Sequence, residues 1–148
     1  MYLGPILKRK MIIGNMCWTI TSYDYVIAAL QTIKYAITQK PWKITKTENT
    51  PMTRSFVPEL DVTKELGPDG IQFYQEMIGM LRWETELGTT DLLHDISILL
   101  QYQAAPREGK TGDILHIFAF LDWKSRLTLY MDTTLPRLNY SVQKNDPS

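Results

Sequence analysis

Apolar side chains recur every three or four residues in four stretches of the chain, which predicts four helices. The first helix lies within residues 21–40, where Thr21 and an acidic residue three positions later resemble a capping box. The other three helices lie within residues 71–124, with Gly88 closing the second and Thr111 beginning the fourth. Because short connections join these three helices, we expect them to pack together as a three-helix cluster.

Two short apolar runs rich in Ile, Met and Trp occupy residues 1–20 and predict a β-hairpin that turns at Gly14 and Asn15. Alternating residues over 126–131 predict one late strand, followed by a polar tail within residues 125–148. The predicted fold class is therefore α+β, mainly α, with an N-terminal β-hairpin, about four helices and one late strand.

Residues 41–70 separate the first two helices and show no sustained period. They carry proline or glycine at six positions, namely Pro41, Pro51, Pro58, Gly67, Pro68 and Gly70. This composition predicts an extended linker that runs over a surface. Because a linker of this length is uncommon inside a small domain, we expect that some of the neighbours it lies against are missing from this chain.

Composition excludes several classes of protein. The chain has 148 residues, of which 44% are hydrophobic and 22% charged, so wholesale disorder and low-complexity structure are excluded. Its single cysteine, Cys17, excludes an intrachain disulfide framework and a multi-cysteine zinc module. No apolar run is long enough to span a membrane, and residues 1–14 do not resemble a signal peptide. We therefore expect an intracellular protein with no membrane partner.

The zero net charge hides a polarity along the chain. Residues 1–54 hold eight basic and two acidic residues, a net charge of +6, whereas residues 55–148 hold eight basic and fourteen acidic residues, a net charge of −6. A basic segment of this kind can face a polyanion, and it can equally form salt bridges with the acidic part of the same chain.

Candidate catalytic and metal-binding residues are sparse. His94 and His116, with Cys17 or Asp95, could ligate zinc in principle, but no pair has the spacing of a zinc site. Asp91 and Asp95 stand four residues apart, as an acid–base pair on one helix face would, yet carboxylates in a first helical turn ordinarily interact with the helix dipole. We therefore predict no catalytic residue and no metal site.

The second predicted helix carries an unusual track of residues. Gln75, Gly79 and Trp83 follow one another at intervals of four, so they share one face of the helix. A glycine inside a helix costs about 1 kcal/mol relative to alanine, so its small size should serve a close approach. Either another helix packs against this face, or a ligand does. An amide, a bare backbone and a flat indole suit the sugars and base edges of a nucleic-acid minor groove.

The sequence resembles the Pol polyprotein of copia-type retrotransposons, in the segment between the polymerase palm and ribonuclease H. The most specific block is the run from Tyr74 to Trp83. The other similar blocks are residues 91–94, 101–109, 2–4, 18–25, 50–53 and 58–61, so the resemblance covers nearly the whole chain.

The resemblance implies a function in nucleic-acid binding. In this family a thumb helix tracks the minor groove of the template-primer duplex, and Gln75, Gly79 and Trp83 match its pattern. Residues Tyr2, Leu3 and Gly4 match the primer grip, which holds the primer terminus, so residues 1–20 would be a primer-grip-like hairpin. Residues 71–124 would be the thumb and connection helices. The implied partner is an RNA–DNA or DNA duplex.

The same resemblance implies that the chain is not an enzyme by itself. The family's polymerase holds Mg²⁺ with a Tyr-x-Asp-Asp turn, and this sequence has no such pair of aspartates. Asp132 is the one strand-end candidate for ribonuclease H chemistry, and we interpret it as a turn residue. Residues 125–148 would lead towards a missing ribonuclease H domain. Met1 falls where the family continues upstream, so we expect a fragment, without a cofactor of its own, of an element whose proteins are cytoplasmic and form virus-like particles.

A second hypothesis comes from another class of function. The chain would be a small helical interaction protein without a nucleic-acid function, and surfaces around Met77, Met80 and Phe118 would bind a partner or a second copy. Apolar surface left by missing domains would favour such self-association.

Overall fold

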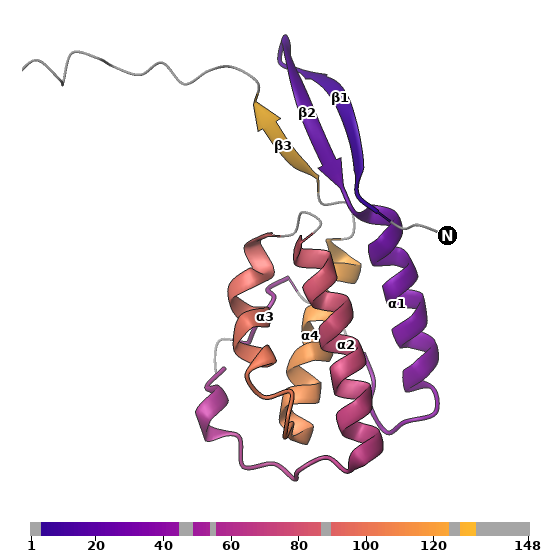
Figure 1. Cartoon of the computed structure of the whole chain (residues 1–148), viewed down its shortest axis with the longest axis vertical. Helices are drawn as coiled ribbons and strands as arrows, with labels where there is room; N and C mark the ends of the chain where they lie inside the picture. The colour runs from indigo at the N-terminus through magenta and orange to yellow at the C-terminus, as the bar shows by residue number, and fades with distance from the viewer. Residues whose placement is uncertain (1–3, 45–48, 54–55, 87–89, 125–127, 133–148) are drawn as a thin grey trace, which may run out of the picture.

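The computed structural model describes residues 4–44, 49–53, 56–86, 90–124 and 128–132. Across these ranges the elements are, in chain order, β1 (Ile6–Ile12), β2 (Asn15–Thr21), α1 (Tyr23–Ile37), the 3₁₀ turn η1 (Pro58–Leu60), α2 (Pro68–Glu86), the 3₁₀ turn η2 (Thr90–Leu92), α3 (Leu93–Leu100), α4 (Glu108–Trp123) and β3 (Leu129–Asp132). Figure 1 shows the helices side by side, with successive helices running in opposite directions and the sheet beyond one end of the bundle. The predicted α+β, mainly α class is confirmed.

One apolar cluster between the four helices forms the core. Its fully buried members include Ile33 of α1, Leu81 of α2, Leu99 of α3 and Ile114 of α4. The hydroxyl of Tyr74, also fully buried, donates a hydrogen bond of 2.8 Å to the Leu99 carbonyl, so α2 and α3 are joined by a polar contact inside the cluster. The apolar positions with helical spacing in the sequence thus form one shared core, and all buried residues of this core lie on the helices or on η2.

The three strands form an antiparallel sheet in the order β1-β2-β3. Leu7 pairs with Ile20, which in turn pairs with Leu129, so the late strand joins the N-terminal hairpin. Asp132 is the last residue of β3 and pairs with Cys17, so its interpretation as a turn residue is wrong. The strand β3 therefore begins three residues after the expected start at residue 126 and ends one residue past the expected end at residue 131.

The turn of the hairpin lies one residue earlier than the sequence predicts. Ile12 pairs with Asn15, which leaves Ile13 and Gly14 as a two-residue turn with φ angles of 47° and 80°. Two positive φ angles are typical of the type I′ turn, which matches the twist of the flanking strands. A β-branched residue is unfavourable in this left-handed conformation. The pairing register of β1 and β2 therefore places Ile13 in a backbone conformation that isoleucine disfavours.

Replacing Ile13 with asparagine should stabilise the hairpin by about 1 kcal/mol, because asparagine tolerates the left-handed conformation. The Ile13 side chain is 98% exposed, so its removal sacrifices almost no burial. Hydrogen exchange of the amides of β1 and β2 would measure the gain. Ile13→Val, which keeps the β-branch, is the control and should show no gain. Equal or weaker protection in Ile13→Asn would contradict this explanation.

The linker between α1 and α2 packs against the bundle. Apolar side chains spread along it are half-buried against the core, namely Trp42, Ile44, Met52, Phe56 and Leu66. The ring of Trp42 stacks on Phe73 of α2, with centroids 5.2 Å apart. Contrary to the expectation of missing neighbours, the described part of the linker finds its neighbours within this chain.

Tertiary contacts also shift the ends of the helices. The fourth helix begins at Glu108, three residues before Thr111, because the amide of Glu108 donates to the carbonyl of Lys64 in the linker. The second helix begins at Pro68, since proline at the first helical position has a suitable φ and needs no hydrogen-bond donor. The first helix is capped at Ser22 without a side-chain hydrogen bond, so the predicted capping box at Thr21 does not form. Gly88, the predicted end of the second helix, lies outside the described residues.

Candidate nucleic-acid interface

The exposed face of α2 contains the three residues that the sequence singled out. Gln75, Gly79 and Trp83 are all exposed, whereas Met77 and Leu81 on the opposite side are fully buried. The spacing of four residues therefore places an amide, a bare backbone and an indole on one solvent-facing track. We call Gln75, Gly79 and Trp83 together the α2 track.

Gly79 is not used for helix packing within this chain. A Cβ atom built on Gly79 would meet no heavy atom within 4 Å other than those of its chain neighbours and of the backbone of its own helix. Of the two explanations for this glycine, packing against another helix of this chain is therefore wrong for the described residues. The backbone of α2 is open at this point to a molecule from outside.

Gln75 is oriented by the connection between α3 and α4. Its side-chain nitrogen donates a hydrogen bond of 3.1 Å to the carbonyl oxygen of Gln103. This hydrogen bond uses the nitrogen of the Gln75 amide, so the oxygen of the same amide is still able to accept a hydrogen bond. The amide is thus held in place before any ligand arrives, which reduces the entropy lost on binding.

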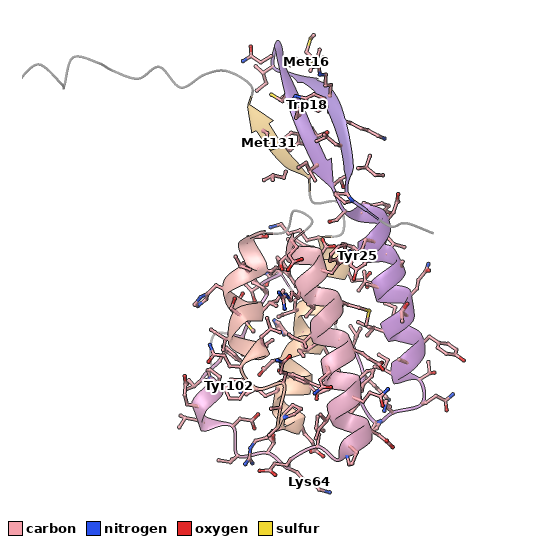
Figure 2. All side chains as sticks on the ribbon, in the orientation of Figure 1. Met16, Trp18, Tyr25, Lys64, Tyr102 and Met131 are labelled. Carbon is pink, nitrogen blue, oxygen red and sulfur yellow. The ribbon has the colours of Figure 1, made fainter. Side chains whose placement is uncertain are left out.

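Trp83 lies near the end of α2 that faces the sheet, and 43% of its surface is exposed. Two contacts hold this end of the helix against α1. The hydroxyl of Tyr25 donates to the Met80 carbonyl at 3.3 Å, and Ser22 donates to the buried carboxylate of Glu84. The label of Tyr25 in Figure 2 marks this junction between helices and sheet. The indole is therefore carried on a fixed scaffold.

The charge of α2 does not favour a polyanion. Its one cation is Arg82, which pairs with Glu86 at 3.2 Å, and the helix also carries Asp69, Glu76 and Glu84. Basic residues are concentrated instead in β1, where Lys8, Arg9 and Lys10 are consecutive and exposed. Any contact with phosphates must therefore come mainly from outside α2.

The predicted primer-grip residues are only partly described. Tyr2 and Leu3 lie outside the described residues, and Gly4 is half-buried just before β1. Gly4 precedes the first strand of the sheet, whereas the α2 track lies on a helix of the bundle. The primer-grip residues and the α2 track therefore remain two separate predictions of nucleic-acid contact.

Sequence reasoning missed a buried ionic cluster at the start of α4. The side chain of Lys110 is only 3% exposed, and its ammonium lies 3.7 Å from Asp61 and 3.8 Å from Asp113. The rings of Phe56 and Tyr102 also face this ammonium. A shallow cavity of about 360 Å³ opens beside the cluster. Its charged lining groups are paired with one another, so we place no ligand there.

The two carboxyls of the cluster are shifted in opposite directions. Burial alone would raise the pKa of Asp61, but hydrogen bonds from Thr63 and the charges of Lys110 and Arg107 hold that pKa below its usual range. Burial raises the pKa of Asp113, and the charge of Lys110 offsets this only in part. No spacing along the chain could reveal this cluster, because Asp61 lies in the linker.

The histidines and the other carboxylates show no metal-binding arrangement. His94 is exposed on α3, while the Nε2 atom of His116 on α4 lies 2.9 Å from the Thr50 carbonyl oxygen. Asp91 pairs with Lys124 at 3.7 Å and belongs to η2, so it does not share a helix with Asp95. Within the ranges that the structure describes, no group of three His, Cys, Asp or Glu side chains could hold a metal ion.

The surface expected for a helical interaction protein is absent at its predicted place. Met77 and Phe118 are buried in the core, and Met80 is half-buried against it.

Comparison of the chain with protein-family models, with curated proteins and with solved structures finds no match in any of the three. None of the described helices is both long enough and apolar enough to cross a membrane.

Proposed function

We propose that this chain binds a nucleic-acid duplex, either an RNA–DNA hybrid or a DNA template-primer, through the α2 track. The observation that supports this most is the exposure of Gln75, Gly79 and Trp83 on one face, with open space above Gly79. In this proposal the chain acts as the thumb and connection part of a copia-type reverse transcriptase, in the cytoplasm, and has no catalysis of its own.

Each member of the α2 track suits a different part of a minor groove. The indole of Trp83 presents a flat apolar surface to sugars, and the amide of Gln75 can hydrogen-bond to base edges. Gly79, between them, allows the sugar-phosphate backbone to approach the helix closely. These contacts recognise shape and need no fixed base sequence.

Phosphate contacts in this proposal come from β1. Because α2 is acidic, the charges of Lys8 and Lys10, which share one face of β1, would have to neutralise phosphates. Two such contacts predict a slope of about −2 in a plot of log affinity against log salt concentration. A much steeper slope would mean that other cations dominate the binding.

Trp83→Ala should weaken binding to a short RNA–DNA hybrid by about 5- to 150-fold, which corresponds to roughly 1–3 kcal/mol. Fluorescence anisotropy with a labelled hybrid measures this directly. Trp123→Ala is the matched control, because Trp123 is an exposed tryptophan at the end of α4 and not on α2. It should bind as the unmodified chain does. Equal affinities for both variants and the unmodified chain would rule out the α2 track.

Gly79→Ala separates folding from binding. Alanine should raise the free energy of unfolding by up to about 1 kcal/mol, because the helix gains propensity and the new methyl group meets nothing. The same variant should bind the hybrid more weakly, since the methyl group holds the duplex backbone away. Denaturant unfolding and anisotropy on one preparation give both values. A more stable protein with unchanged affinity would show that no ligand approaches Gly79.

A further inference from the structure

One face of the three-stranded sheet is apolar apart from one arginine, whereas the opposite face mixes lysine, threonine and asparagine with Ile6, Ile12 and Cys17. Residues that pair directly across the sheet share a face, and the pairs Leu7–Ile20, Arg9–Trp18 and Met11–Met16 all lie on the same one. Leu129 and Met131 of β3 extend this face, because they pair with Ile20 and Trp18. The apolar sheet face therefore consists of Leu7, Arg9, Met11, Met16, Trp18, Ile20, Leu129 and Met131.

The apolar sheet face is not covered by the helical bundle. Met11 is 65% exposed, Leu7 is 54% exposed, and Met131 is also exposed. None of these residues belongs to the apolar core between the helices. Figure 2 shows Met16, Trp18 and Met131 on the sheet, beyond the end of the helices. An antiparallel sheet normally turns its apolar face towards a second layer, so this face has the character of a binding surface.

The dimensions of the face suit a single α-helix. The strands β1 and β2, with seven residues each, are about 23 Å long, which equals the length of about 15 residues of helix, and β3, with four residues, covers about 13 Å of this length. The axes of the two outer strands in a three-stranded sheet are about 10 Å apart, close to the diameter of one helix. Three flexible methionine side chains can adapt to the ridges of such a helix.

The charge on the face selects among possible occupants. Arg9 is the one charged residue of the apolar sheet face, and its guanidinium carbon lies 4.6 Å from the centroid of the Trp18 ring. Lys8 and Lys10 alternate with Arg9 along β1 and belong to the opposite face. A second copy packed face to face would bury two arginines and bring no carboxylate to either, which is unfavourable. A helix with one carboxylate in its apolar stripe would pair with Arg9.

We infer that the apolar sheet face docks an amphipathic helix of another protein, and that this helix carries a carboxylate opposite Arg9. The methionine and leucine side chains supply buried apolar area, and the Arg9–carboxylate pair sets the register and the choice of partner. This interaction does not depend on duplex binding by the α2 track.

The test uses two labelled 18-residue amphipathic peptides with a leucine stripe, which differ only in a central Glu or Lys within that stripe. The full chain should bind the Glu peptide at least about tenfold more tightly than the Lys peptide. Arg9→Glu should reverse this order, so that the variant prefers the Lys peptide. Lys10→Glu introduces the same charge change on the opposite face of the same strand and should keep the original order.

Several outcomes would overturn the proposal. One is the failure of both peptides to bind a chain that circular dichroism shows to be folded. Another is a reversal of preference in Lys10→Glu as large as in Arg9→Glu, which would indicate long-range charge effects alone. Light scattering that shows a dimer, which Met11→Asp dissociates, would assign the face to a second copy. Binding of single-stranded oligothymidine that Arg9→Glu abolishes, without peptide binding, would assign it to nucleic acid.

Discussion

Replacing Lys110 with alanine should lower the free energy of unfolding by about 3–5 kcal/mol. The loss arises because Asp61 and Asp113 would remain beside the start of α4 without their buried cation. The same lysine also lies in the first turn of a helix, where the macrodipole disfavours a positive charge. Its presence there is therefore explained by the two carboxylates. Urea unfolding at neutral pH measures the effect.

The pH dependence distinguishes an uncompensated charge from lost packing. As the pH falls, Asp113, whose pKa is raised, takes up its proton before Asp61, whose pKa is lowered, and each proton decreases the cost of leaving the carboxyls without Lys110. The difference in unfolding free energy between the unmodified chain and Lys110→Ala should therefore be smaller at pH 3 than at pH 7. A difference that stays constant between these two pH values would assign the loss to packing of the aliphatic stem.

Lys124→Ala is the matched control for Lys110, since the two lysines stand at opposite ends of the same helix, Lys110 in its first turn and Lys124 directly after its last residue. The ion pair of Lys124 with Asp91 is half-exposed, so its loss should change stability by less than about 1 kcal/mol. Adding Asp61→Asn and Asp113→Asn to Lys110→Met should recover most of the lost stability, because the cluster then holds no unpaired charge.

Phe118→Ala should also lower the free energy of unfolding by about 3–5 kcal/mol, because it leaves a cavity at the centre of the bundle. The ring of Phe118 is 1% exposed and lies beside Leu30 of α1 and Leu81 of α2. Phe118→Leu fills part of this space and should cost less. Tyr35→Ala, on the exposed side of α1, should change stability by less than about 0.5 kcal/mol. Thermal and urea unfolding of the three variants give these values.

This prediction also tests the second hypothesis about function. If Phe118 formed part of a docking surface, its truncation would change partner binding and leave stability nearly unchanged. A stability loss below about 1 kcal/mol would therefore contradict the position of Phe118 in the core.

The sequence predicted the elements better than their ends. The four helical stripes are long and periodic, so their buried faces could be assigned from spacing alone, and the α2 track is exposed because it lies opposite such a stripe. The turn at Ile13 could not be found in this way, since pairing along the whole hairpin determined it. The early start of α4 at Glu108 likewise depends on Lys64, more than forty residues earlier.

The candidate site shows the same division. Exposure of Gln75, Gly79 and Trp83 follows from helical geometry, but the hydrogen bond from Gln75 to Gln103 requires the connection after α3 to fold back. The cluster around Lys110 and the apolar sheet face depend on which segments meet in space. The spacing of residues along the chain does not show which distant segments come into contact.

The pairing of β3 with β2 has a consequence for the order of folding. Ile20 and Leu129 lie more than a hundred positions apart along the chain, so closing this loop in an unfolded chain would cost considerable entropy. Figure 1 shows that α1 begins and α4 ends at the same end of the bundle, which brings the two strands together once the helices have docked. The β1–β2 hairpin can form from local contacts, but β3 joins it late. A paired β3 is thus evidence, in any single molecule, that the helices have already assembled.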